Sequence, residues 1–141
     1  MMLLYLPPTE KTPEVIFDDD RKLLQIKGHC LPENVRDFSQ MVTGKLESYL
    51  ENLDNKQESD TKNKPFRVNF KLGYFNTAAA KFIADVLTHL RSSIQKGSNI
   101  KIFWHYNEED YDMLEAGEDM AKMVDVPMTF VMVVGTPSNE Q

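Results

Sequence analysis

Carboxylates crowd one short segment of the chain, HYNEEDYDMLEAGEDM, which spans His105–Met120. The acids in it are Glu108, Glu109, Asp110, Asp112, Glu115, Glu118 and Asp119. Such a cluster suits either a divalent-metal site or an acidic recognition surface. A simpler interpretation is structural: Asp112 caps a helix, Glu115 completes a capping box, and the other acids favour the first turns. No loop glycine or bidentate glutamate falls at EF-hand spacing, so we favour a helix start combined with a recognition surface.

A second candidate site is the threonine in GYFNTAAAK, Gly73–Lys81, which joins a strand-like run to a helix-like run. Either Asn76 or Thr77 would cap the helix, beside unpaired N–H groups and the positive end of the helix dipole. A phosphate on the Thr77 hydroxyl would be stabilised there. The alanines at 78–80 add no bulk, so the active site of another enzyme could approach closely. The simpler interpretation is that the residue only caps the helix.

Other reactive residue types form no convincing catalytic arrangement. His29 and Cys30 are adjacent in an expected strand and so point to opposite faces. The three histidines lack metal-ligand spacing. The run Asp18-Asp19-Asp20 resembles the acid pocket of a response-regulator receiver, but it lies in an expected hairpin rather than at a strand-to-helix turn. Without a glycine-rich phosphate loop or a GxSxG motif, catalysis is not expected.

Hydrophobic periodicity predicts the elements that must position these residues. The expected strands are Glu14–Asp18, Lys22–Cys30, Phe66–Phe75, Asn99–Tyr106 and Met128–Val134, and the expected helices begin near Asn34, Thr77 and Met113. The first helix buries Val35, Phe38, Val42, Leu46, Tyr49 and Leu53. Residues 54–65 are predicted to be an exposed loop and residues 135–141 a frayed tail.

This β-β-α-β-α-β-α-β order predicts an α/β fold with a mixed, mostly parallel five-stranded sheet. If strands 66–75 and 99–106 are parallel neighbours, Thr77 and the acidic segment lie at the same edge of the sheet. A phosphate on Thr77 would then meet the helix dipole favourably and the acids unfavourably, an opposition that could form a switch.

Composition limits the function classes. The 141 residues make one domain, residues 1–141, with 41% hydrophobic and 27% charged residues, the balance of a soluble globular protein. The net charge of -6 argues against nucleic-acid binding. The start of the chain, MMLLYLPP, reads neither as a signal peptide nor as a membrane span. A single cysteine gives no sign of an oxidising compartment, so a cytoplasmic protein is expected.

Four motifs, TPEVIFD, GHCLPEN, YFNTAAAK and WHYNEEDYDMLEAGEDM, resemble the SiaC family of bacterial regulatory phosphoproteins. The resemblance extends from about Thr12 to Phe130. It implies a fold similar to STAS domains, the anti-sigma-factor antagonists. It also implies that a Ser/Thr kinase (SiaB-like) phosphorylates the threonine of the YFNT motif, here Thr77, and that a PP2C-type phosphatase (SiaA-like) removes the phosphate. The unphosphorylated form would bind and activate a diguanylate cyclase (SiaD-like), raising cyclic di-GMP and promoting aggregation or biofilm growth.

The chain departs from the family pattern at three places. Alanines 78–80 replace the usual serines, which leaves Thr77 as the one hydroxyl in this turn. Tyr111 interrupts a more continuous acidic run, and His29-Cys30 stands where an Arg-Ser pair is typical. The last two differences concern the surface that a partner would contact.

We therefore expect a non-enzymatic signalling protein, without cofactor or metal, whose partner choice depends on phosphorylation of Thr77. The expected partner-binding residues are Tyr74, Asn76, Ala78, Lys81, Glu108, Glu109, Asp110 and Asp112. The alternative is a small enzyme that uses the acids of 108–119 to hold a metal. A third possibility, a structural subunit of a larger assembly, would require a large exposed apolar patch.

Overall fold

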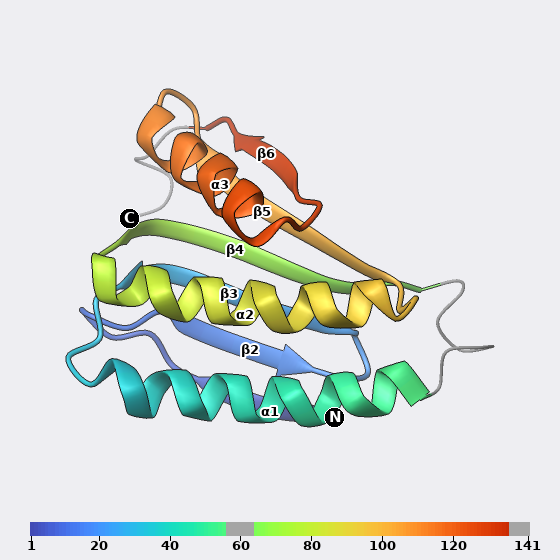
Figure 1. The fold of residues 1–141 in the computed structure, drawn as a ribbon. Helices are drawn as coiled ribbons and strands as arrows, with labels where there is room; N and C mark the ends of the chain where they lie inside the picture. The colour runs from blue at the N-terminus through green and yellow to red at the C-terminus, as the bar shows by residue number, and fades with distance from the viewer. Residues whose placement is uncertain (56–63, 136–141) are drawn as a thin grey trace.

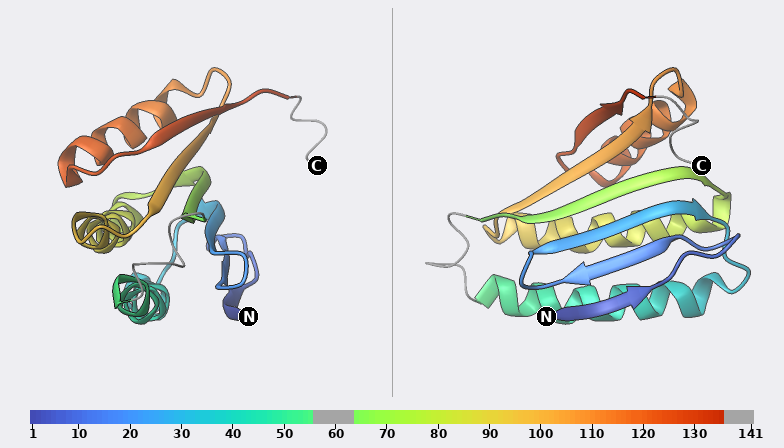
Figure 2. Two further views of the ribbon diagram at one scale, coloured as in Figure 1. Left: turned by 90° about the vertical axis from the view of Figure 1, so that its right-hand side faces the viewer. Right: turned by 180° about the vertical axis from the view of Figure 1, so that it is seen from behind.

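The computed structural model describes residues 1–55 and 64–135, and three helices lie against one face of its six-stranded sheet (Figure 1). The strands are β1 (Met2–Leu6), β2 (Glu14–Asp18), β3 (Leu23–Cys30), β4 (Phe66–Phe75), β5 (Ile100–Asn107) and β6 (Thr129–Val133), and the helices are α1 (Val35–Asn55), α2 (Thr77–Gln95) and α3 (Tyr111–Val124). Figure 2 shows all three helices on the same side, and within the described residues no helix covers the other face of the sheet.

The strands lie in sequence order, β1-β2-β3-β4-β5-β6. The pairs β1–β2 and β2–β3 are antiparallel, and β3–β4, β4–β5 and β5–β6 are parallel. The predicted α/β class, the hairpin and the parallel core are thus confirmed, with β5 inside the sheet as expected. The strand number is one higher than predicted, because the apolar run MLLYL at the start of the chain pairs with β2. Its Leu4 and Leu6 pack against the core, which explains why this run is apolar.

Alternation and caps explain the local structure. In β4, alternate residues (Phe66, Val68, Phe70 and Leu72) are buried beneath the helices. The expected cap of α1 is confirmed, since Asn34 Oδ1 accepts a 3.1 Å hydrogen bond from the Asp37 amide.

The first helix extends further than predicted: the loop was expected to begin at residue 54, but α1 continues to Asn55. Asp54 and Asn55 belong to α1. The Asp54 carboxylate accepts hydrogen bonds from Ser93 (3.1 Å) and Ser98 (2.6 Å), which tie the end of α1 to the end of α2. Residues 56–63 of the expected loop and residues 136–141 of the expected tail lie outside the described residues.

The sheet forks at its carboxyl edge. Pairing of β4 with β5 runs from Phe66/Ile100 only to Phe70/Trp104. Beyond that point β4 stays with β3 as far as Phe75, whereas β5 stays with β6 as far as Asn107. Figure 1 shows β5 and β6 turning away from β4 together with α3. The two arms of this fork carry the candidate functional turns.

No helix within residues 1–55 and 64–135 is both long and apolar enough to cross a bilayer.

Candidate functional site at the start of α2

The turn from β4 into α2 is built on a complete N-cap that does not use the threonine hydroxyl. Asn76 has extended backbone angles (φ -93, ψ 179), and its Oδ1 accepts a 2.8 Å hydrogen bond from the Ala79 amide. Its carbonyl also accepts from the Ala80 amide at 3.0 Å. The sequence left Asn76 and Thr77 as alternative caps, and the geometry assigns this role to Asn76.

Thr77 is the first residue of α2 and is exposed. Its hydroxyl makes no hydrogen bond to any residue within 1–55 or 64–135. The amides of residues 77 and 78 come before the first intrahelical bond, so they point out of the helix with the positive end of its dipole. An unengaged hydroxyl therefore lies beside backbone groups that favour an anion.

Further exposed residues precede and follow Thr77 in the chain. Tyr74 is 56% exposed, and Ala78 and Lys81 are also exposed. The Lys81 Nζ lies 4.0 Å from the Asp85 carboxylate one helical turn on, so this surface ion pair is weak. Of the three alanines, Ala79 is fully buried in the core, which gives it a packing role that the sequence alone did not reveal.

The acidic segment forms the turn from β5 into α3. Asp110 Oδ1 accepts a 3.1 Å hydrogen bond from the Met113 amide, so Asp110 is the N-cap and α3 begins at Tyr111. The structural interpretation that made Asp112 the cap is therefore wrong: Asp112 lies exposed in the first turn. Glu108 and Glu109 are exposed, and Glu109 has a left-handed backbone with φ 75.

Both turns lie at the same edge of the sheet, because β4 and β5 are parallel neighbours. The expectation that Thr77 and the acids share an edge is thus confirmed, although the two turns stand on separate arms of the fork. A packed path connects them. Phe75, the last residue of β4, meets Trp104 edge-on with ring centroids 6.1 Å apart, and the Trp104 indole N–H donates to the Met113 carbonyl at 2.9 Å.

The sequence signal for this path was weak, since neither Trp104 nor Gly117 stands in a reactive motif. A Cβ on Gly117 would lie 2.5 Å from Trp104 Nε1 and 2.6 Å from its Cδ1. Glycine is therefore required for α3 to lie directly on the indole. A glycine in the middle of an amphipathic helix, one that costs helix propensity, was the available clue.

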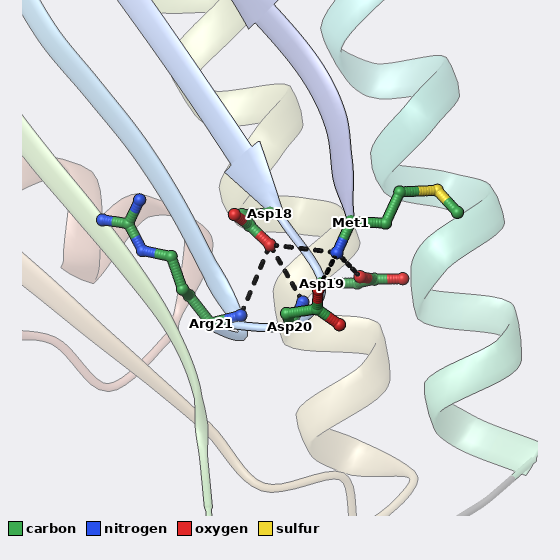
Figure 3. A network of polar contacts seen from close by, with 5 residues as sticks. All are labelled: Met1, Asp18, Asp19, Asp20 and Arg21. Carbon is green, nitrogen blue, oxygen red and sulfur yellow. Dashed lines mark hydrogen bonds and ion pairs between the residues drawn. The ribbon is translucent and has the colours of Figure 1, made fainter.

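No three possible ligand groups of the acidic segment lie within 4.8 Å of one another in the described part of the chain. Within residues 1–55 and 64–135, the one set of three potential ligand groups within 4.8 Å of each other is Asp18, Asp19 and Asp20. Figure 3 shows these aspartates around the ammonium group of Met1, which is 2.8 Å from the Asp19 carboxylate and also contacts Asp18 and Asp20. Hydrogen bonds to Asp19 and Asp20 raise the pKa of this ammonium to about 10. The cluster that resembled a receiver pocket thus already holds a cation in the hairpin turn.

The His29-Cys30 pair is divided between the two faces of the sheet, as predicted. Cys30 is fully buried, and burial raises the pKa of its thiol to about 12. His29 is exposed. A protonated, buried thiol is a poor nucleophile, so this pair does not form a catalytic site.

Residues 6–133 match the sequence model of the SiaC family regulatory phosphoproteins. The chain belongs to the SiaC family. A relative of this SiaC-family chain in Pseudomonas aeruginosa (strain UCBPP-PA14), an uncharacterized protein, is 26% identical over 124 residues, which cover 88% of this chain and 91% of the relative. The family resemblance of the four motifs is thereby confirmed.

Solved structures agree with the fold. The crystal structure of apo-SiaC from Pseudomonas aeruginosa has a TM-score of 0.68 to this SiaC-family chain at 25% identity, covering 92% of this chain and 96% of that one. A structure of diguanylate cyclase SiaD in complex with its activator SiaC from the same organism has a TM-score of 0.72 to this chain at 24% identity. The match covers 94% of this chain and 99% of that one.

Proposed function

We propose that this chain is a non-enzymatic signalling protein whose binding to an effector is controlled by phosphorylation of Thr77. The observation that carries the proposal is that Asn76 and not Thr77 caps the start of α2. Asn76 provides the cap, so the neighbouring Thr77 hydroxyl is exposed and has no structural partner among the described residues. A hydroxyl without a structural duty can be esterified without loss of a stabilising contact.

The modification is a phosphoryl transfer from ATP. A partner Ser/Thr kinase forms the bond between Thr77 Oγ1 and the γ-phosphorus, ADP leaves, and a base of the kinase takes the hydroxyl proton. The product carries a charge of about -1.5 to -2 at pH 7 beside the first amides of α2. A PP2C-type phosphatase reverses the change by hydrolysis.

The effector we propose is a diguanylate cyclase, by analogy with SiaC of Pseudomonas aeruginosa, which has been crystallised with the cyclase SiaD that it activates. The surface for it combines Tyr74, Ala78 and Lys81 of the first arm with Glu108, Glu109 and Asp112 of the second. Tyr111 adds an apolar contact, since it is 69% exposed. Asn76 and Asp110, which we also propose to contact the partner, are the N-caps of α2 and α3 in the same two turns.

Phosphorylation changes this surface in one place only. The Thr77 phosphate can accept hydrogen bonds from the free amides of α2, and it adds negative charge to an edge that already carries the exposed acids of the β5–α3 turn. A partner that matches the unmodified edge then meets extra repulsion and a bulkier turn. The unmodified form is therefore the form that binds the effector.

The test compares unmodified protein with protein carrying phosphothreonine at position 77, installed during translation, against a purified cyclase. We expect the unmodified chain to bind and to raise cyclic di-GMP synthesis, and the phosphorylated chain to bind roughly 10-fold or more weakly, as loss of about 1.4 kcal/mol requires. Peptide mass spectrometry after incubation with kinase and ATP maps the site.

The chain offers a matched control. Thr88 is a second exposed threonine of α2, but its hydroxyl donates to the Ala84 carbonyl at 2.8 Å. Thr77→Val should abolish phosphorylation and keep effector binding, whereas Thr88→Val should be phosphorylated normally. Phosphate on another residue, or equal effector binding by both forms, contradicts the proposal.

A further inference from the structure

The fork between β4 and β5 opens a cavity of about 540 Å³ that none of the roles above uses. Its lining residues come from four strands: Lys27, Gly28, Lys71, Leu72, Gly73, His105, Tyr106, Asn107 and Val133. The cavity arises where the β4–β5 ladder ends at Phe70/Trp104, so that the next residues of the two strands no longer pair with each other. Lys27 and Lys71 in its lining alternate with the buried Ile26 and Phe70, so their side chains lie on the face of the sheet opposite the helices. That face of the sheet is in view on the right of Figure 2.

Two lysines lie side by side in the wall of this cavity. Lys27 of β3 and Lys71 of β4 are register partners, and their buried neighbours Ile26 and Phe70 face the helices. Adjacent like charges on one face of a sheet destabilise it. Neither ammonium forms an ion pair with a carboxylate in the described part of the chain. Glu14, the register partner of Lys27 on its other side, accepts a hydrogen bond from the Tyr5 hydroxyl instead.

A histidine completes the basic wall from the other arm. His105 follows the last β4–β5 pair, and its Nε2 is buried without a hydrogen-bond partner among the described residues. Desolvation, and then the charge of Lys71, lower the pKa of His105. The titratable side chains lining the cavity are Lys27 from β3, Lys71 from β4, and His105 and Tyr106 from β5, while β6 contributes the apolar Val133.

We propose that this fork cavity is a binding site for a phosphate group, free or carried by a small phosphate ester. A phosphate dianion would lie between the two ammonium charges, and its negative charge would favour the protonated form of the neighbouring His105. Charge-assisted contacts of this kind are among the strongest hydrogen bonds in proteins. The cavity is larger than inorganic phosphate, and Tyr106 and Val133 provide contacts for the organic part of an ester.

The site is separate from the switch at Thr77, because its two lysines lie on the face of the sheet opposite the helices and it uses no residue of α2 or α3. Its ligand therefore adds a second input to the same domain. Failure of phosphate binding would leave the proposed modification of Thr77 untouched, and the reverse also holds.

The experiment titrates the unphosphorylated full chain by calorimetry and by ¹H–¹⁵N NMR with inorganic phosphate, glycerol phosphate and adenosine monophosphate. Sodium chloride at matched ionic strength corrects for general screening. We expect saturable binding, with shifts at Gly28, Gly73 and Asn107, and a rise in the pKa of His105 on saturation. Tighter binding of either ester identifies an ester as the ligand, and equal binding of all three identifies phosphate itself.

Three variants test the assignment. Lys27→Gln and Lys71→Gln should each weaken binding roughly 10-fold or more, the range for loss of a charged hydrogen bond, and the double variant should show no saturation. Lys101→Gln is the matched control: Lys101 is an exposed lysine on the same strand as His105 that does not line the cavity. A cavity that does not bind phosphate, or an equal loss in Lys101→Gln, overturns the proposal. Urea unfolding checks that each variant remains folded.

Discussion

Replacement of Gly117 by alanine tests the packed path that connects the two turns. The new Cβ would lie 2.5 to 2.7 Å from Nε1, Cδ1 and Cε2 of Trp104, inside any normal carbon contact distance. Trp104 is fully buried, and its ring packs against that of Phe70 in a tilted arrangement with 5.4 Å between centroids, so the indole has little room to move aside. The helix must therefore move outward, which strains the 2.9 Å bond from the indole N–H to Met113.

The expected change in the free energy of unfolding is the sum of three contributions. Overpacking a core of this kind costs about 1–3 kcal/mol. Weakening a buried hydrogen bond destabilises the protein by about a further 1 kcal/mol. The better helix propensity of alanine stabilises it by about 1 kcal/mol. We expect the free energy of unfolding to fall by about 1–3 kcal/mol, read as a lower urea midpoint with an unchanged slope.

A glycine-to-alanine substitution at another position is expected to stabilise the protein. Gly44 lies on the exposed side of α1, and a Cβ there meets nothing within 4 Å. Gly44→Ala should therefore stabilise the protein by about 0.4–1 kcal/mol. If Gly117→Ala proved as stable as the parent chain, or if both substitutions shifted the midpoint in the same direction, the packing explanation for Gly117 would be refuted.

Three further predictions use single residues. Asn76→Ala should cost about 1 kcal/mol of stability as the lost cap, while Thr77→Val should change it by less than about 0.5 kcal/mol; comparable losses in urea unfolding would contradict the assignment of the cap. The Cys30 thiol, with its pKa raised to about 12 by burial, should react with a disulfide reagent at neutral pH only after unfolding; fast reaction of the native protein would be inconsistent with its burial. The pKa of His105 is lowered from 6.5 by desolvation and by Lys71, so the unfolded state binds more protons and stability should decline as the pH falls below about 6.5; NMR titration of the His105 ring that gave a raised pKa would contradict this.

The sequence predicted those parts of the fold whose signals are local. Alternation in 66–75 located β4, and the Asn34 cap located α1. The first strand was missed because five apolar residues before two prolines carry no partner information, and only pairing with β2 makes them a strand. Asp54 was placed in a loop for a similar reason: its hydrogen bonds to Ser93 and Ser98 come from far along the chain.

The candidate site was predicted in part for the same physical reason. The motif around Thr77 is continuous in sequence, so its position at the start of a helix could be predicted. The choice of Asn76 over Thr77 as the cap depends on the backbone angles and the side-chain hydrogen bond of Asn76. The N-cap of α3 is Asp110 and not the predicted Asp112, because either aspartate satisfies a capping pattern in the sequence. The fork could not be predicted from the sequence, since it depends on where the hydrogen-bonded pairing between β4 and β5 ends.

The fork also changes how a charge at Thr77 could act. Thr77 and the acids share an edge but follow strands that part after Phe70/Trp104, so a phosphate need not meet the carboxylates directly. A partner that spans both arms would contact the new charge and the acids together, and its own basic groups would decide the balance. Charge reversal on one arm should therefore alter effector binding in both phosphorylation states. Asp112→Lys provides the test. A change in effector binding confined to the phosphorylated form would mean that the phosphate and the acids interact within the chain. An equal change in both forms would mean that the phosphate and the acids act on each other only through the bound partner.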